Sequence, residues 1–311
     1  MGNLYIVSLF NTFNLMILKL NLSGSAEPLI NYLKSYLRIR DSLLLEIDTT
    51  KRAFVAKVFT DERTAARFAS LTFDDANVTI LEDTGENERG DMRIKLGVLM
   101  HLKKLIQVIE RFGTDADDKG VSNFEISFNY EPLIKGNNVE YIATDVSFAS
   151  SILKMKMDGF RISEFHYLSD EDFYNNVFNA QDPIRVNVSA DAIDTIIKTS
   201  DIVKKDNKKD ALMFYVEDKF LYVKNKMLDR NKPSDFIYQI GEVSVEPSYP
   251  ISFPVNRETF IKMITKAEGD LRIILGHSGQ VGPDGNYKVN RILFDSEITS
   301  TKIAIAGMSD N

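Results

Sequence analysis

The stretch YPISFPVNRETFIKMITKAEGDLRIILG, residues 249–276, decides the fold. Apolar residues alternate with polar ones from Ile251 to Val255, which indicates a strand. From Asn256 to Ala267 the apolar residues recur at helical spacing, and residues 270–275 again have the character of a strand. The stretch therefore predicts a strand, a helix that follows it almost without a loop, and a second strand.

The same unit is found three more times along the chain. Residues 17–48, 92–130 and 184–217 each read as strand, helix and strand, and further short alternating runs follow. Residues 141–160 match residues 291–308 in position and rhythm, so the first two units correspond to the last two. The sequence thus predicts four β-α-β-β-β units arranged as two pairs.

This pattern predicts an α+β protein of two similar domains. Each domain is built from two β-α-β-β-β units, with the helices on one face of a curved antiparallel sheet. We expect an N-terminal extension over residues 1–15 and a first domain over residues 16–167. An acidic, Asn-rich connector over residues 168–183 then leads into a second domain over residues 184–311.

Composition excludes several classes of protein. The 311 residues include no cysteine, which rules out disulfides and thiolate chemistry and is compatible with a reducing cytoplasm. No apolar run reaches the roughly 18 residues that a membrane-spanning helix needs, and no positive charge precedes the apolar stretch near the N-terminus, so we expect neither a membrane protein nor a signal peptide. The formal net charge of −7 argues against a surface that binds nucleic acid all over.

The predicted helices are nevertheless mildly basic on their free faces. Lysines on one solvated helix face are common and would carry no weight alone. The same pattern on all four helices of an acidic chain predicts a surface for the phosphate backbone, without sequence reading. The outward-facing cations are Lys34, Arg38, Lys104, Arg111, Lys198, Lys205, Lys262 and Lys266.

With this pattern the sequence resembles the DNA sliding clamps, the polymerase processivity factors, and in particular their tailed-bacteriophage type. The resemblance covers nearly the whole chain after residue 16 and is clearest in ISFPVNRETFIKMITKAEGDLRIIL and TKIAIAGM. It implies that three copies of the two-domain chain form a homotrimeric ring around double-stranded DNA, with the eight helix cations facing the DNA. The acidic loops at residues 83–91 and 114–118 and a nearly neutral third helix depart from the pattern and leave the DNA path and the ring count open.

The resemblance also implies protein partners. A DNA polymerase and a clamp loader would each dock a short peptide into an apolar pocket near the connector and the C-terminal segment. An aromatic connector that covers its own core is the alternative for these residues. The candidates for the pocket are Phe173, Tyr174, Val177, Phe178, Ala306 and Met308.

No constellation for catalysis is found in the sequence. His101, His166 and His277 share no metal-ligand spacing, and we expect each to be a polar surface residue. We therefore expect a protein that is not an enzyme and has no catalytic residues, metal or cofactor. The alternative function is a non-encircling accessory protein of clamp fold, or a protein-interaction scaffold. The expected location is the cytoplasm, that of an infected bacterial host if a phage encodes the chain.

Overall fold

The computed structural model describes most of the chain. The described residues are 16–85, 95–113, 122–135, 138–158, 177–202, 210–226, 236–265, 268–281, 287–296 and 299–308.

The first half of the chain forms two of the predicted units. The first comprises β1 (Met16–Gly24), α1 (Glu27–Leu37), β2 (Ser42–Asp48), β3 (Ala53–Phe59) and β4 (Ala65–Thr72), followed by an additional strand β5 (Val78–Asp83). The second comprises β6 (Lys95–His101), α3 (Leu102–Gly113), β7 (Ser122–Lys135), β8 (Asn138–Ala149) and β9 (Lys154–Asp158).

The second half repeats the order. Its units are β10 (Gln181–Val188), α5 (Ala190–Ile202), β11 (Ala211–Glu217), β12 (Phe220–Lys226) and β13 (Ile237–Glu242), then β14 (Ser252–Asn256), α6 (Arg257–Met263), β15 (Leu271–Val281), β16 (Tyr287–Ser296) and β17 (Thr301–Ala306). The predicted fold class is confirmed, because each unit places its helix directly after its first strand and nearly all strand pairs are antiparallel.

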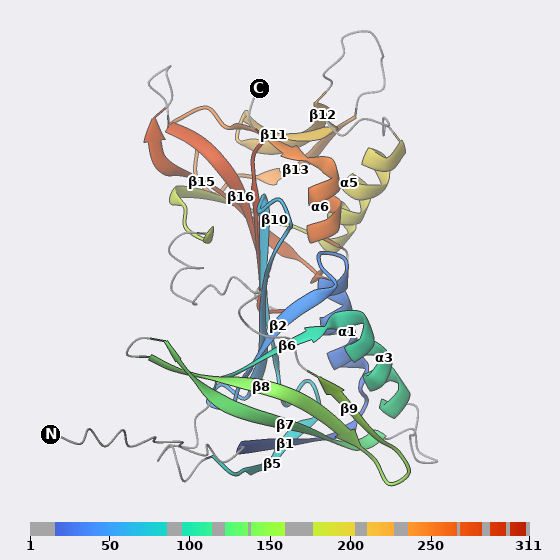
Figure 1. Ribbon diagram of the computed structural model, residues 1–311. Coiled ribbons are helices and arrows are strands. Elements are labelled where there is room, and N and C mark those ends of the chain that lie inside the picture. Colours follow the sequence, from blue (N-terminus) through green and yellow to red (C-terminus); the bar gives the residue numbers. More distant parts are fainter. Residues whose placement is uncertain are drawn as a thin grey trace, which may run out of the picture.

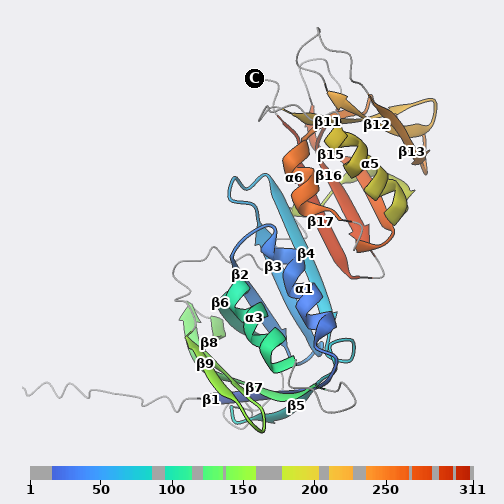
Figure 2. The same ribbon diagram turned by 90° about the vertical axis from the view of Figure 1, so that its right-hand side faces the viewer.

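One long sheet passes through both halves of the molecule. Over the described residues it has 13 strands in the order β10-β15-β16-β17-β4-β3-β2-β6-β8-β7-β1-β5, with β9 paired to β8. The two halves join where β17 pairs antiparallel with β4, from Lys302 opposite Phe68 to Ile305 opposite Ala65. Helices α1, α3, α5 and α6 all lie on the same side of the sheets, in the row α3, α1, α6, α5 (Figures 1 and 2).

The buried stripes of these helices account for two cores. In the first core, Leu29, Leu33 and Tyr36 of α1 pack among the side chains of the curved sheet. In the second, Phe260 and Met263 of α6 do the same. Burying each such side chain contributes about 1.5–3 kcal/mol, so the apolar stripes fix which face of each helix stays free. The limits of the two domains at residues 168–183 stay a prediction.

Helix α6 is shorter than its periodicity predicts. The Asn256 side chain caps it by accepting a hydrogen bond from the Thr259 N–H at 2.9 Å. The helix ends at Met263, and Ile264 is extended with φ −120° and ψ 135°, so the predicted continuation to Ala267 is wrong. The chain leaves the helix here with Ile264 fully buried and reaches Glu268, which binds Arg67 of the first domain.

His277 is also not where the sequence places it. The expectation of a polar surface residue is wrong, because β15 continues through this residue and pairs it with Gln181 of β10. The ring is buried, with Nε2 3.0 Å from a carboxylate oxygen of Asp182. Its Nδ1 accepts the Gly279 N–H at 3.0 Å. His277 therefore ties the end of the connector to the second domain.

Candidate functional site

The free faces of the helix row carry the cations that the sequence singles out. All six of these cations that lie on described residues are exposed. The helices that carry them form one row on one side of the sheets (Figure 2). Lys205 and Lys266 lie outside the described residues. The six are Lys34, Arg38, Lys104, Arg111, Lys198 and Lys262.

Acidic residues within the helix row form ion pairs with three of these cations. Such exposed ion pairs contribute only about 0–1 kcal/mol, so a phosphate can compete for each lysine. The helix row is nevertheless less positive than a count of its lysines suggests. The pairs are Lys34–Glu110 at 2.7 Å, Lys198–Asp194 at 2.6 Å and Lys262–Glu258 at 3.1 Å.

Helix α3 carries two exposed lysines that form no ion pair with the described residues. Lys104 is exposed and forms no ion pair with the described part of the chain, and the same holds for its neighbour Lys103, which the sequence reasoning missed. The signal that could have identified Lys103 is its position directly beside Lys104 in the sequence. Arg38 differs, because one guanidinium nitrogen lies 3.4 Å from the backbone carbonyl oxygen of Ile261 on α6. Arg38 therefore points across the junction between the domains.

A buried ion pair joins the domains beneath the helices. Arg67 of β4 donates to both carboxylate oxygens of Glu268, at 2.7 and 3.0 Å, and the two residues are 3% and 4% exposed. Burial opposes the charged form of Arg67, but attraction and hydrogen bonding by Glu268 outweigh it, so the pKa of Arg67 is raised. The Arg67 guanidinium also lies over the ring of Tyr36, 5.3 Å from its centroid. Burial in turn raises the pKa of Tyr36 to about 12.

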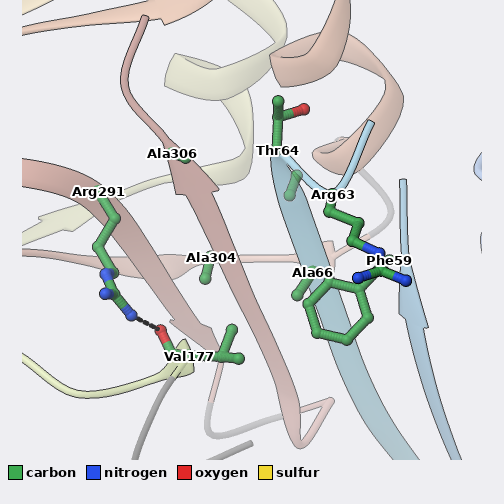
Figure 3. Close-up of a pocket in the computed structure, with 9 residues that line it drawn as sticks. Phe59, Arg63, Thr64, Ala66, Val177, Arg291, Ala304 and Ala306 are labelled. Carbon is green, nitrogen blue, oxygen red and sulfur yellow. Dashed lines mark hydrogen bonds between the residues drawn. The ribbon is translucent and has the colours of Figure 1, made fainter. Parts of the chain in front are cut away.

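A pocket of about 260 Å³ opens at the strand seam between β17 and β4. Its floor consists of small side chains, among them Ala66, Ala304 and Ala306 (Figure 3). Because alanines stand where larger side chains would fill the surface, the seam is hollowed. Phe59 and Val177 contribute the remaining apolar walls.

The structure brings together only part of the predicted peptide pocket. Val177 and Ala306 line the pocket at the seam. Phe178 packs against the neighbouring apolar cluster, with the Lys302 ammonium 4.8 Å from its ring centroid. The Met308 N–H donates to the Pro254 carbonyl oxygen at 2.9 Å. Phe173 and Tyr174 lie outside the described residues.

Two arginines of the pocket were missed by the sequence reasoning. Arg63 comes from the turn between β3 and β4, and Arg291 comes from β16 (Figure 3). No local pattern could have paired them, because they lie in different halves of the chain and reach the same pocket only through the β4–β17 seam.

The described residues contain neither a candidate metal site nor a candidate membrane-spanning helix. No group of three or more His, Asp or Glu side chains there could hold a metal ion. None of the described helices is long and apolar enough to cross a membrane.

Comparison of the whole chain with solved structures identifies the architecture. The DNA polymerase III β chain of Streptococcus pneumoniae superimposes with a TM-score of 0.58 at 10% sequence identity, over 94% of this chain and 66% of that chain. The sliding clamps have this fold, and so does this chain.

Two further clamp-fold structures match over nearly their whole length. PCNA of A. fulgidus, solved with the C-terminal region of FEN-1 bound, has a TM-score of 0.58 at 6% identity, over 94% of this chain and 99% of that chain. Proliferating cellular nuclear antigen of Entamoeba histolytica has a TM-score of 0.56 at 10% identity, over 93% of this chain and 99% of that chain. No protein-family model and no curated protein sequence matches this chain. The likeness is therefore one of clamp fold.

Proposed function

We propose that this chain is a DNA sliding clamp. Copies of it join into a closed ring around double-stranded DNA, the helix row faces the DNA without reading its sequence, and the outer surface holds a DNA polymerase and a clamp loader. The protein acts by tethering, not by catalysis. The clamp fold supports this function, and the observation that carries it is the pair of unpaired strand edges at the two ends of the molecule.

The β4–β17 seam indicates how two copies would join. Strand β17 is the third strand after the helix of the fourth unit, and β4 is the third strand after the helix of the first unit. The equivalent strands of the other two units are β9 and β13. Among described residues, β9 pairs only with β8 and β13 pairs only with β12. Pairing β9 of one copy with β13 of the next would repeat the internal seam between molecules.

Both edges expose apolar side chains, as an interface requires. Ile152, just before β9, is 77% exposed, and Met155 on β9 is 38% exposed. Ile237 on β13 and Val245 just after it are 64% and 65% exposed. An edge strand with exposed apolar residues pairs readily with another chain, so these two edges fit each other. Because the two surfaces differ, the contact is head-to-tail, and a head-to-tail contact forms a ring when its rotation closes.

The number of copies and the source of the chain are proposals of the same kind. We propose three copies, giving six domains in the ring, as the resemblance implies. The pocket at the seam, lined by Val177 and Ala306, would receive the partner peptide. The bacteriophage type, and with it a location in the cytoplasm of an infected bacterial host, stays a prediction.

Mass measurement by light scattering tests the ring. We expect a particle of about three times the chain mass of 35.3 kDa at micromolar concentration. Ile237→Lys and Met155→Lys should each give monomers, because a lysine cannot be buried unpaired at the seam. Leu81→Lys is the matched control, because Leu81 is 55% exposed on β5, an edge strand with no part in the proposed contact.

Mixing the two variants tests the direction of the contact. Ile237→Lys retains an intact β9 edge and Met155→Lys retains an intact β13 edge, so the mixture should form a dimer of about twice 35.3 kDa and no larger particle. A wild-type chain that stays monomeric, or variants that keep the full particle, would exclude this ring.

A scaffold that does not encircle DNA is the second candidate, because ion pairs neutralise three of the exposed helix cations. Retention on DNA separates the two functions. Chains reassembled from monomers around a nicked circular plasmid should stay bound and should leave when the plasmid is linearised. A scaffold would not distinguish the two forms of the plasmid.

A further inference from the structure

The pocket at the β4–β17 seam has cationic walls over an apolar floor. Arg63 and Arg291 stand on opposite sides of the alanine floor (Figure 3). The volume of about 260 Å³ lies below the roughly 300–1,000 Å³ of pockets for small-molecule ligands, and suits a few side chains of a peptide. A purely apolar peptide would bring no anion to these two guanidinium groups.

Arg63 has no evident role in the fold. It is exposed and forms no ion pair with any residue that the structure describes. The nearby Asp61 is bound by Arg40 at 2.8 Å. Arg63 also has φ +55°, a left-handed conformation that favours glycine or asparagine. An arginine that is held in this conformation and has no ion pair among the described residues points to a role in binding.

Arg291 is already partly desolvated at the opposite wall. Burial lowers the pKa of its guanidinium, and one nitrogen donates to the Val177 carbonyl oxygen at 2.8 Å. This hydrogen bond holds the side chain at the rim of the pocket. A carboxylate that enters the pocket would meet an oriented guanidinium, which binds carboxylates through strong, directional hydrogen bonds.

We propose that the pocket selects a peptide segment of a partner protein in which an aspartate or glutamate stands beside a small aliphatic side chain. The aliphatic group lies on the alanine floor, and the carboxylate lies between Arg63 and Arg291. This inference rests on the proposed function of the pocket as a docking site and adds the chemistry that it recognises.

Selection from a phage-displayed library of random dodecapeptides on the full-length chain tests the inference. The selected peptides should share an Asp or Glu next to an aliphatic residue. Replacing that acid by its amide, or Arg63 by Gln, should weaken binding about tenfold in fluorescence anisotropy, and added salt should weaken it further. Arg63→Glu should restore binding of a peptide that carries Lys in place of the acid.

Two control variants separate the possible failures. Arg52→Gln should bind the peptides as the wild type does, because Arg52 is an exposed arginine with φ +49° in a turn away from the pocket. Ala306→Trp should abolish binding, because Ala306 is an exposed part of the pocket floor. Peptides that Ala306→Trp blocks but that lack an acid, or that ignore Arg63→Gln, would overturn the acidic specificity and leave the docking site standing. Peptides that Ala306→Trp does not block, or an absence of binding peptides, would overturn both.

Discussion

Removing the charge of Glu268 should destabilise the whole molecule. Glu268→Gln leaves the guanidinium of Arg67, which is 3% exposed, without its anionic partner. Breaking a buried pair from one side costs about 3–5 kcal/mol, a large share of a typical stability of about 5–15 kcal/mol. The bidentate contact at 2.7 and 3.0 Å places this pair in the upper part of that range.

The double variant Arg67→Met, Glu268→Leu should recover most of the loss. An apolar pair of similar volume avoids the desolvation of two charges and is often neutral or stabilising by about 1–4 kcal/mol. It also removes the Arg67 Nε atom, which is buried without a hydrogen-bond partner among the described residues.

Urea unfolding followed by circular dichroism measures both free energies. Glu258→Gln is the control, because it removes an acid from the exposed pair with Lys262 and should cost less than about 1 kcal/mol. A cost for Glu268→Gln no larger than that of the control would refute the reasoning, as would a double variant less stable than Glu268→Gln.

Three further predictions concern stability, capping and DNA. The folded-state pKa of Tyr36 is raised to about 12, above its ordinary value of 10.0, so its contribution is complete below pH 10 and is lost as the pH rises toward 12. Over that window the wild type should lose about 3 kcal/mol more free energy of unfolding than Tyr36→Phe in urea titrations at fixed pH, and equal losses would count against a buried neutral phenol. Asn256→Ala should cost about 1 kcal/mol by removing the cap of α6, with Asn256→Asp as a control that retains it. Glu110→Gln should release Lys34 for phosphate contact, tighten DNA binding and steepen its salt dependence; an unchanged salt slope would show that Lys34 does not face DNA.

Local sequence patterns were enough to predict most of the fold. The order of strands and helices in all four units follows from spacing, because burial of one face imposes a period on each element. Phe260 and Met263 recur at the helical period within residues 256–267, and both are buried. The end of α6 was missed because it depends on a residue about 200 positions away: the chain leaves its helix and brings Glu268 to Arg67.

The candidate site was predictable only in part, for the same reason. The outward direction of Lys34 and Lys104 follows from helical period. Helical period does not predict whether an acid on a neighbouring helix neutralises a lysine, since the Lys34–Glu110 pair depends on how α1 packs beside α3. The pocket likewise exists only because β4 and β17 pair, and no local signal marks Arg63 or Arg291 as its walls.

The strand seam also has a consequence for how the chain is made. Strand β4 ends at Thr72 and its partner β17 begins at Thr301, so ribosomes that add roughly 5–20 residues per second need about 10–45 s for the roughly 230 residues between them. During that interval the first domain can form its core while the edge of β4 has no partner in its own chain. Such an edge is a template for pairing with another nascent chain. The greatest risk of mispairing during biosynthesis therefore falls in the interval when the first domain has formed and β17 has not yet been synthesised.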